Sequence, residues 1–216
     1  MLPTNEEEES LFSSGALTVA GIDEVGRGAW AGPVSVGVAV VTRASLATFP
    51  DGVADSKMLS PVIRERLFAP LAAAVTAYAV GHASPAECDE LGMTKAQRLA
   101  TARAFEQLTV DVDAVIADGK TDFTGRDHVR MIVGADRRCV AVAAASVLAK
   151  VTRDRMMIDF APSYPGYAFE QNKGYPSPTH LEGLSRLGLS ALHRASWSFA
   201  PAFEATRGDA AEIASR

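Results

Sequence analysis

Short apolar stretches of the kind that form β-strands dominate the first two thirds of this chain. Residues 17–23 and 34–42 are two such stretches, joined by a glycine-rich turn. Residues 76–83, 113–118 and 129–133 are further short apolar runs of the same kind. The pattern therefore predicts five strands.

Apolar residues at helical spacing fill much of the rest of the chain. Ser60-Pro61 and Ser84-Pro85 each place a capping serine before a proline, which is typical of the start of a helix. The strongest helical pattern is alanine-rich at first and then charged, and it puts Ser146, Lys150 and Asp154 on one side. The predicted helices cover residues 61–75, a stretch beginning at 85, and residues 94–108, 141–160, 178–187 and 189–195.

Strands first and helices interleaved later predict an α/β fold, with a mixed five-stranded sheet flanked by helices. No repeat and no long Pro/Gly/Ser linker divides the sequence, so we expect one domain over residues 16–204, with a helical C-terminal region from about residue 160. Residues 1–15 are acidic and lack apolar periodicity, and residues 205–216 are similarly polar. We expect a disordered acidic tail at the first end and a frayed tail at the second.

Composition places the chain among ordinary globular proteins, with 48% hydrophobic and 22% charged residues. The longest apolar stretches, residues 31–41 and 140–149, are shorter than the roughly 18 residues that a membrane span needs. Four consecutive glutamates near the start occupy the place where a secretory signal would carry positive charge. We therefore expect a cytoplasmic protein with no membrane partner.

Cysteine spacing argues against a zinc site, whereas net charge does not exclude a nucleic-acid partner. Cys88 and Cys139 lack the paired spacing of a zinc site, so we expect two buried thiols. The net charge is −5, but setting aside the four N-terminal glutamates leaves 22 acidic against 21 basic residues. Net charge therefore leaves a nucleic-acid partner open.

Carboxylates follow three of the predicted strands. Asp23 and Glu24 end the first strand just before a turn with two glycines, Asp118 closes another, and Asp136 follows a third. A carboxylate in an apolar sheet costs several kcal/mol unless it is paired or binds a cation. Hard oxygen ligands favour Mg²⁺ or Mn²⁺. Ligands of α/β sheets bind beyond the strand ends, so these acids are candidates for one metal site, with solvated strand ends as the alternative.

Five sequence blocks, in order and at matching spacing, resemble the ribonuclease HII family. They are residues 21–33 (GIDEVGRGAWAGP), 55–60 (DSKMLS), 143–154 (AAASVLAKVTRD) and 173–176 (KGYP) with His180, and the stretch around His193-Arg194 and 198–201 (SFAP). The resemblance extends from about residue 17 to about residue 201. One block alone would be modest evidence, whereas five in register are specific.

This resemblance implies a ribonuclease H-like fold and a metal-dependent endonuclease. Such an enzyme hydrolyses the RNA strand of RNA/DNA hybrids and incises 5′ to single ribonucleotides in duplex DNA, leaving 3′-hydroxyl and 5′-phosphate ends. The implied metal ligands are the four carboxylates Asp23, Glu24, Asp118 and Asp136. They would hold two Mg²⁺ or Mn²⁺ ions in the working complex. The family likeness also favours a monomer.

The same resemblance implies a set of substrate contacts. It assigns the turn Gly26-Arg27-Gly28 to the RNA–DNA junction and Tyr175 to the ribose there. Backbone phosphates would be contacted by Lys57, Ser146 and Lys150. The alternative for Tyr175 is a packed core tyrosine, and without the resemblance Lys150 would more often be a solvated lysine.

Several other residues are weaker candidates. Asp154 lies between two arginines and is better explained by a surface ion pair. His180 and His193 are expected to be packed histidines in amphipathic C-terminal helices. The turn at residues 26–28 matches neither GxxxxGK[ST] nor GxGxxG, which argues against ATP binding.

The sequence departs from the family pattern at three places without losing a proposed ligand. Gly134 stands where a lysine is common, Lys120 where an asparagine is common, and Trp30 where a smaller aliphatic residue is common. The missing lysine would weaken charge support near Asp136, and the arginines at 137 and 138 are candidates to compensate for it. Rival functions are a related nuclease of the same fold, such as a hybrid-only ribonuclease or a junction resolvase, and a catalytically silent duplex-binding module.

Overall fold

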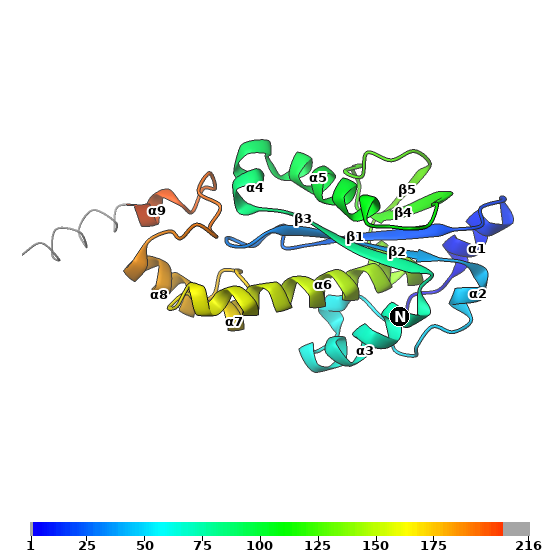
Figure 1. Cartoon of the computed structure of the whole chain (residues 1–216), viewed down its shortest axis with the longest axis horizontal. Helices are drawn as coiled ribbons and strands as arrows, with labels where there is room; N and C mark the ends of the chain where they lie inside the picture. The colour runs from blue at the N-terminus through cyan, green and yellow to red at the C-terminus, as the bar shows by residue number, and fades with distance from the viewer. Residues whose placement is uncertain (1, 205–216) are drawn as a thin grey trace, which may run out of the picture. The chain divides into compact units, whose positions relative to one another are not determined.

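The computed structural model describes residues 2–204 (Figure 1). The contacts within the chain divide it into two compact units. The second unit contains the C-terminal helical region and two segments from earlier in the chain. The first unit comprises the chain up to Val25, Ser35–His82 and Gln97–Thr152, and the second comprises Gly26–Val34, Ala83–Ala96 and the chain from Arg153 onward. The expected frayed tail, residues 205–216, lies outside the described residues.

The first unit is built on a mixed five-stranded sheet, as predicted. Its strand order is β3-β2-β1-β4-β5. Strand β1 pairs antiparallel with β2 and parallel with β4, and β4 pairs parallel with β5. The bounds lie within two residues of the prediction: β1 Val19–Val25, β2 Val34–Val41, β3 Ala77–Ala83, β4 Ala114–Asp118 and β5 Val129–Ile132.

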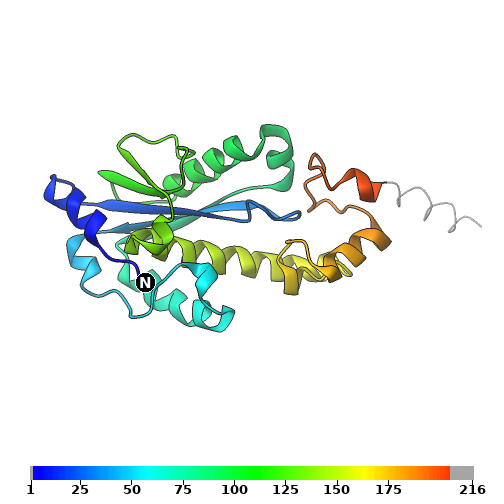
Figure 2. The same ribbon diagram turned by 180° about the vertical axis from the view of Figure 1, so that it is seen from behind.

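Helices cover both faces of this sheet, as both ribbon views show (Figures 1 and 2). Helices α3 (Pro61–Ala74) and α6 (Val140–Phe160) lie on one face, and α5 (Met93–Glu106) lies on the other. Missing side chains let α6 come close to the strands. A Cβ on Gly21 would lie 2.2 Å from the backbone carbon of Ala141, and a Cβ on Gly37 would lie 2.6 Å from the Ala145 carbonyl oxygen.

Helix starts follow the local signals in the sequence. The Ser60 side chain accepts a hydrogen bond from the Ile63 amide at the start of α3. Ser84 caps α4 (Pro85–Leu91) in a reciprocal capping box with Glu87. The predicted helix over residues 178–187 is α8 (Pro178–Leu187). Shorter helices that the pattern did not predict are α2 Arg43–Leu46, η1 Ser56–Met58, η2 Ala135–Arg137, η3 Ala161–Ser163, α7 Phe169–Asn172 and α9 Pro201–Glu204.

The N-terminal segment forms helix α1 (Glu6–Ser13) where a disordered tail was expected. Phe12 packs into the core of the first unit. Glu8 is fully buried, and its carboxylate accepts a hydrogen bond of 2.8 Å from the Ala141 amide near the start of α6. A carboxylate at a helix N-terminus satisfies an otherwise unpaired amide and complements the helix dipole. One of the four glutamates is therefore a buried partner rather than a solvated charge.

The second unit has its own small core, formed by Met157, Tyr167, Phe169 and Leu184 together with Ala31. The helix predicted over residues 189–195 is absent from this unit; turns occupy its place. Side-chain and backbone hydrogen bonds explain the difference, since a ring nitrogen of His193 accepts from Ser190 and the Arg194 amide donates to the Trp30 carbonyl.

The longest apolar helical stretches fall short of a membrane span. Within residues 2–204, no helix is both long enough and apolar enough to cross a bilayer.

Candidate active site

Two of the predicted ligands end neighbouring parallel strands. Ile22 of β1 pairs with Ala117 of β4, so Asp23 and Asp118, each one position further on, extend the same register. Gly21 faces α6, and alternate residues of a strand share a face. Asp23 and Asp118 therefore both point toward the α6 side of the sheet.

Asp23 is buried, with 3% of its surface exposed. Its Oδ1 atom accepts a hydrogen bond of 2.9 Å from the Glu24 amide. The pKa of Asp23 is raised to about 8, mainly by burial and then by the charges of Glu24 and Asp136, while Ser146 and Lys57 oppose the shift. The folded chain thus holds this carboxylate where it favours a proton or a cation.

Asp136 is brought next to Asp118 by the turn that follows β5. Gly134 adopts a left-handed conformation (φ 70°) before η2, and the Ala135 amide donates to Asp118 Oδ1 at 2.9 Å. The carboxylate of Asp136 is buried, and its pKa is raised by burial, then by the charges of Asp55 and Asp118. The two carboxylates are therefore electrostatic neighbours.

Lys57 supplies positive charge at this cluster. Its Nζ atom lies 3.8 Å from Asp136 Oδ2, although 68% of the lysine side chain is exposed. Partial burial alone would lower the pKa of Lys57, but the charges of Asp23 and Asp136, followed by Asp55 and Glu24, raise it overall. The ammonium group is thus tied to the carboxylates while remaining accessible to solvent.

Asp55 links the Lys57 loop to the Asp136 turn. Its Oδ1 atom accepts from the Lys57 amide at 2.9 Å, and its Oδ2 atom accepts from Arg137 Nε at 3.1 Å. The charges of Lys57 and Arg137 both lower the pKa of Asp136. Arg137 therefore supplies positive charge beside Asp136 in a chain that has Gly134 where the family often has lysine.

The donor chemistry of this cluster suits a divalent cation. Oxygen ligands from several carboxylates are what Mg²⁺ and Mn²⁺ prefer, and Asp23 and Asp136 are buried with raised pKa values. Glu24 starts from the opposite face of β1 to Asp23, because strand side chains alternate. Among residues 2–204, no three His, Cys, Asp or Glu side chains already form a closed metal cage. The carboxylates thus form a row of charged neighbours that a cation would draw together.

Ser146 occupies a different environment from the phosphate contact expected of it. It is 2% exposed, and its hydroxyl is hydrogen-bonded to the Ser56 hydroxyl, with 2.8 Å between the two oxygens. It also forms a hydrogen bond with Asp23 that lowers the pKa of that carboxyl. Ser146 therefore contacts Asp23 inside the protein and does not face the solvent. Lys150, one helical turn further along α6, is partly exposed.

In the second unit the structure brings Gly26 and Tyr175 together. The Gly26 amide donates to the Tyr175 hydroxyl at 3.1 Å. Gly26 has a φ of 82°, and a Cβ there would lie 2.2 Å from Arg153 Nε, so the position requires glycine. Gly28 has open space around its Cα, and the Arg27 side chain is exposed. The turn and the tyrosine expected at the ribose therefore share one surface of this unit.

Two buried arginines that the sequence analysis missed hold this turn. Arg194 donates to the carbonyls of Gly26 (2.6 Å), Arg27 (2.9 Å) and Gly32 (3.1 Å). Arg153 donates to the carbonyls of Pro33, Ala31 and Lys173 at 2.8–3.0 Å. Burial, together with the charge of Arg153, lowers the pKa of Arg194 to about 10. Arg153 lies next to Asp154 in the sequence, where a surface ion pair was the simpler interpretation, so no local signal revealed its role.

Trp30 and the two C-terminal histidines are packed inside the second unit. The Trp30 ring stacks on Phe199, with centroids 4.2 Å apart and planes 2° from parallel, which explains the larger residue at this position. His180 and His193 are buried, as predicted, although His193 lies in a turn rather than a helix. Cys88 and Cys139 are buried free thiols, also as predicted.

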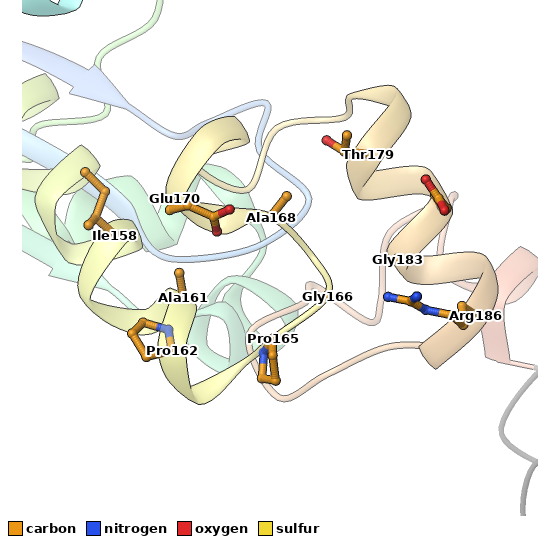
Figure 3. Close-up of a pocket in the computed structure, with 11 residues that line it drawn as sticks. Ile158, Ala161, Pro162, Pro165, Gly166, Ala168, Glu170, Thr179, Gly183 and Arg186 are labelled. Atoms are coloured by element: carbon orange, nitrogen blue, oxygen red, sulfur yellow. The ribbon is translucent and has the colours of Figure 1, made fainter.

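The second unit also contains a hollow of about 600 Å³ between the end of α6 and α8 (Figure 3). Ile158, Pro162 and Pro165 line one side of it, and Thr179 and Arg186 come from α8. None of the residues predicted to bind metal or substrate lines this hollow. The candidate active site is therefore the carboxylate cluster and not this hollow.

Comparison with known proteins agrees with this arrangement. A family model described as ribonuclease HII matches residues 20–200. A ribonuclease HII from Streptomyces avermitilis is 50% identical over 199 residues, covering 91% of this chain and 84% of the relative. A ribonuclease HII from Thermus thermophilus is 43% identical over 200 residues, covering 91% and 93%.

Solved structures support the same assignment. The ribonuclease H2 from Pyrococcus horikoshii OT3 has a TM-score of 0.76 at 31% identity, covering 87% of this chain and 97% of that one. The Mn²⁺ complex of Bst-RNase HIII shares the fold, with a TM-score of 0.69 at 21% identity, covering 94% and 72%. With its sheet, its strand-end carboxylates and a family match over most of its length, the chain belongs to the ribonuclease HII family and is a ribonuclease H, a hydrolase that cleaves RNA/DNA hybrids.

Proposed function

We propose that this enzyme incises duplex DNA 5′ to single embedded ribonucleotides and hydrolyses the RNA strand of RNA/DNA hybrids. The products carry a 3′-hydroxyl on the upstream piece and a 5′-phosphate on the downstream piece. Two divalent ions, Mg²⁺ or Mn²⁺, act in the working complex. The family resemblance extends the proposal to a cytoplasmic monomer that works in ribonucleotide excision and DNA replication.

The observation that carries the proposal is the group of neighbouring carboxylates at the ends of β1 and β4 and in the turn after β5, of which Asp23 and Asp136 are buried. Asp23, Glu24, Asp118 and Asp136 are the proposed ligands. Burial and like charge raise the pKa values of Asp23 and Asp136, and a cation relieves both effects. Divalent ions bound there supply a hydroxide for attack on phosphorus and charge stabilisation for the leaving 3′ oxygen.

The protein's own groups position the phosphodiester. Lys57 is exposed and lies beside Asp136, so its ammonium is available to a backbone phosphate once cations share the carboxylate charge. Lys150 extends the positive surface along α6. Ser146 holds Asp23 through its buried hydroxyl, so we assign it to positioning a ligand rather than to binding phosphate.

Ribose recognition is assigned to the turn Gly26-Arg27-Gly28 and to Tyr175. The Tyr175 hydroxyl accepts a hydrogen bond from the Gly26 amide, which holds the tyrosine beside the turn that we assign to the ribose. Gly28 is exposed and a Cβ there would meet open space, so the missing side chain lets the sugar approach the backbone. The 2′-hydroxyl is read in this scheme and takes no part in the bond cleavage.

A duplex that carries one ribonucleotide in a labelled DNA strand tests the proposal. We expect a metal-dependent cut on the 5′ side of the ribonucleotide, with an upstream product that a DNA polymerase can extend. The same duplex without the ribonucleotide should stay intact. Cleavage of RNA/DNA hybrids without incision at the single ribonucleotide would instead indicate a hybrid-only ribonuclease. Binding without cleavage in Mn²⁺ would indicate a silent duplex-binding protein.

A further inference from the structure

Two histidines form a direct contact inside the second unit. His180 Nε2 lies 3.0 Å from His193 Nε2, and both rings are buried. At the other side of each ring, His180 Nδ1 lies 2.9 Å from the Tyr175 carbonyl oxygen, and His193 Nδ1 lies 2.9 Å from the Ser190 amide nitrogen. The carboxylate cluster and the substrate contacts proposed above do not use these rings.

The two outer partners determine where the ring hydrogens lie. A carbonyl oxygen only accepts, so His180 Nδ1 must carry a hydrogen and donate it to Tyr175. A backbone amide only donates, so His193 Nδ1 is bare and accepts from the Ser190 amide. The Ser190 hydroxyl lies 2.8 Å from the same nitrogen and can also donate to it. His193 therefore carries its hydrogen on Nε2 and donates it to the bare Nε2 of His180. One arrangement of hydrogens satisfies every contact, and in it the two rings are neutral and have opposite tautomers.

An additional proton would break this arrangement at either ring. On His193 Nδ1 an added proton could bond to the Ser190 hydroxyl oxygen but would take the acceptor away from the Ser190 amide. On His180 Nε2 it would face the hydrogen of His193. The surroundings agree with neutral rings, because burial lowers the pKa of His180, and burial together with His180 lowers the pKa of His193 to about 4. Phe169 packs edge-on against His180 at 5.4 Å between centroids.

The hydrogen bonds lead to the residue proposed to read the ribose. Tyr175 is held at three points: its carbonyl by His180, its amide by the Asn172 carbonyl at 3.0 Å, and its hydroxyl by the Gly26 amide. The His180 contact fixes the peptide plane that follows the tyrosine. The direction of that plane helps set where the ring stands relative to the turn at residues 26–28.

We infer that His180 and His193 are positioning residues. They link the Ser190 amide to the Tyr175 carbonyl by a series of hydrogen bonds that all donate in the same direction, and this series fixes the tyrosine for ribose recognition. The inference rests on the function proposed above for Tyr175. The hydrogen placement itself can be measured without any activity.

Nitrogen-15 NMR of the full chain with labelled histidine rings tests the hydrogen placement at pH 7. The chain has four histidines, and loss of a signal in His180→Asn or His193→Gln assigns each ring. We expect His180 protonated on Nδ1 and His193 protonated on Nε2. Two identical tautomers, or a doubly protonated ring, would overturn the inference even if the enzyme incises ribonucleotides normally.

Kinetics on the single-ribonucleotide duplex tests the positioning role. His180→Leu removes the donor to Tyr175 and should raise KM about tenfold, the effect of roughly one neutral hydrogen bond. Mn²⁺ affinity should stay unchanged. His180→Asn keeps an N–H near the position of Nδ1 and should restore KM to within about twofold. An unchanged KM in folded His180→Leu, or no rescue by asparagine, would contradict the role.

His82→Leu is the matched control. His82 belongs to β3 in the first unit, where its Nδ1 atom lies 2.7 Å from Ser35 Oγ, so its loss also removes a hydrogen bond from a histidine ring. It should lower the melting temperature without changing KM. If His180→Leu does not fold, the tautomers of the wild-type chain still decide the inference. Failure of wild type to incise the duplex would reject the proposed function and leave the NMR result standing.

Discussion

The Lys57 ammonium lies 3.8 Å from the Asp136 carboxylate and joins an exposed side chain to a buried one. Because Asp23 also acts on this ammonium, Lys57 balances part of the negative charge of the cluster in the absence of a cation. The same exposure makes it the side chain of the cluster best placed to meet a phosphate.

Replacing Lys57 with glutamine should weaken substrate binding. We expect KM to rise about tenfold, and the slope of log affinity against log salt to fall by about 0.9, because one phosphate contact is lost. Steady-state kinetics at several salt concentrations measures both effects. Lys95→Gln changes an exposed lysine in the same chemical way and should alter neither. An unchanged salt slope in Lys57→Gln would remove Lys57 from the phosphate contacts.

Asp23→Asn should separate activity from stability. Loss of a proposed ligand charge should reduce cleavage more than about 100-fold. At pH 7 the metal-free protein should become more stable, by at least about 1 kcal/mol or roughly 2–4 °C. Folding raises the pKa of Asp23 to about 8, so the wild-type chain must take up a proton or bury a charge when it folds, and asparagine requires neither. Cleavage assays and thermal unfolding in EDTA measure the two effects. Asp51→Asn, at an exposed position, is the control and should change neither activity nor stability. Retained activity in Asp23→Asn would refute the ligand assignment.

Arg194→Lys should destabilise the second unit although the charge is kept. A lysine cannot reproduce the fork that donates to the carbonyls of Gly26, Arg27 and Gly32. We expect a loss of roughly 2–3 kcal/mol in the free energy of unfolding, measured by urea denaturation. Arg66→Lys, on the exposed side of α3, should cost almost nothing. Equal stability of the two variants would show that the three carbonyl contacts contribute little.

Stability should fall as the pH drops from about 6.5 toward 4. The pKa of His193 is lowered to about 4 in the folded chain, against an ordinary value near 6.5, so the unfolded chain binds more protons in this window. The stability linked to His193 is therefore fully present above pH 6.5 and is lost on acidification, by on the order of 2–3 kcal/mol at pH 4. Denaturation curves between pH 4.5 and 7.5 give the free energy of unfolding at each pH. This free energy should depend less steeply on pH in His193→Gln than in the wild type, and the exposed His128→Gln should leave the dependence unaltered.

The N-terminal helix should contribute to stability through Glu8. Glu8→Ala leaves the Ala141 amide without its partner and should cost about 1–2 kcal/mol, as the loss of a helix cap does. Thermal unfolding should show a decrease of roughly 2–8 °C. Glu6→Ala, in the same helix but exposed, is the control. Identical melting temperatures for both variants would mean that Glu8 does not stabilise α6.

Local sequence signals were enough for the strands, the helix starts and the strand-end acids. Ser60 and Ser84 cap helices because their hydroxyls bond to amides three residues away, which is a relationship within one short segment. The position of Asp23 and Asp118 at strand ends follows from the apolar runs that precede them. These features depend on near neighbours, so a periodicity argument can find them.

Only the tertiary structure decided which polar residues are buried. Glu8, Arg153 and Arg194 look like solvated charges in the sequence, and each is fully buried against backbone groups more than a hundred positions away. The placement of the ring hydrogens in His180 and His193 likewise depends on the contact between the two rings, which are 13 positions apart and meet only after folding. Burial is a property of the assembled core, and hydrogen bonds to distant backbone leave no local pattern, so these roles could not be found from the sequence alone.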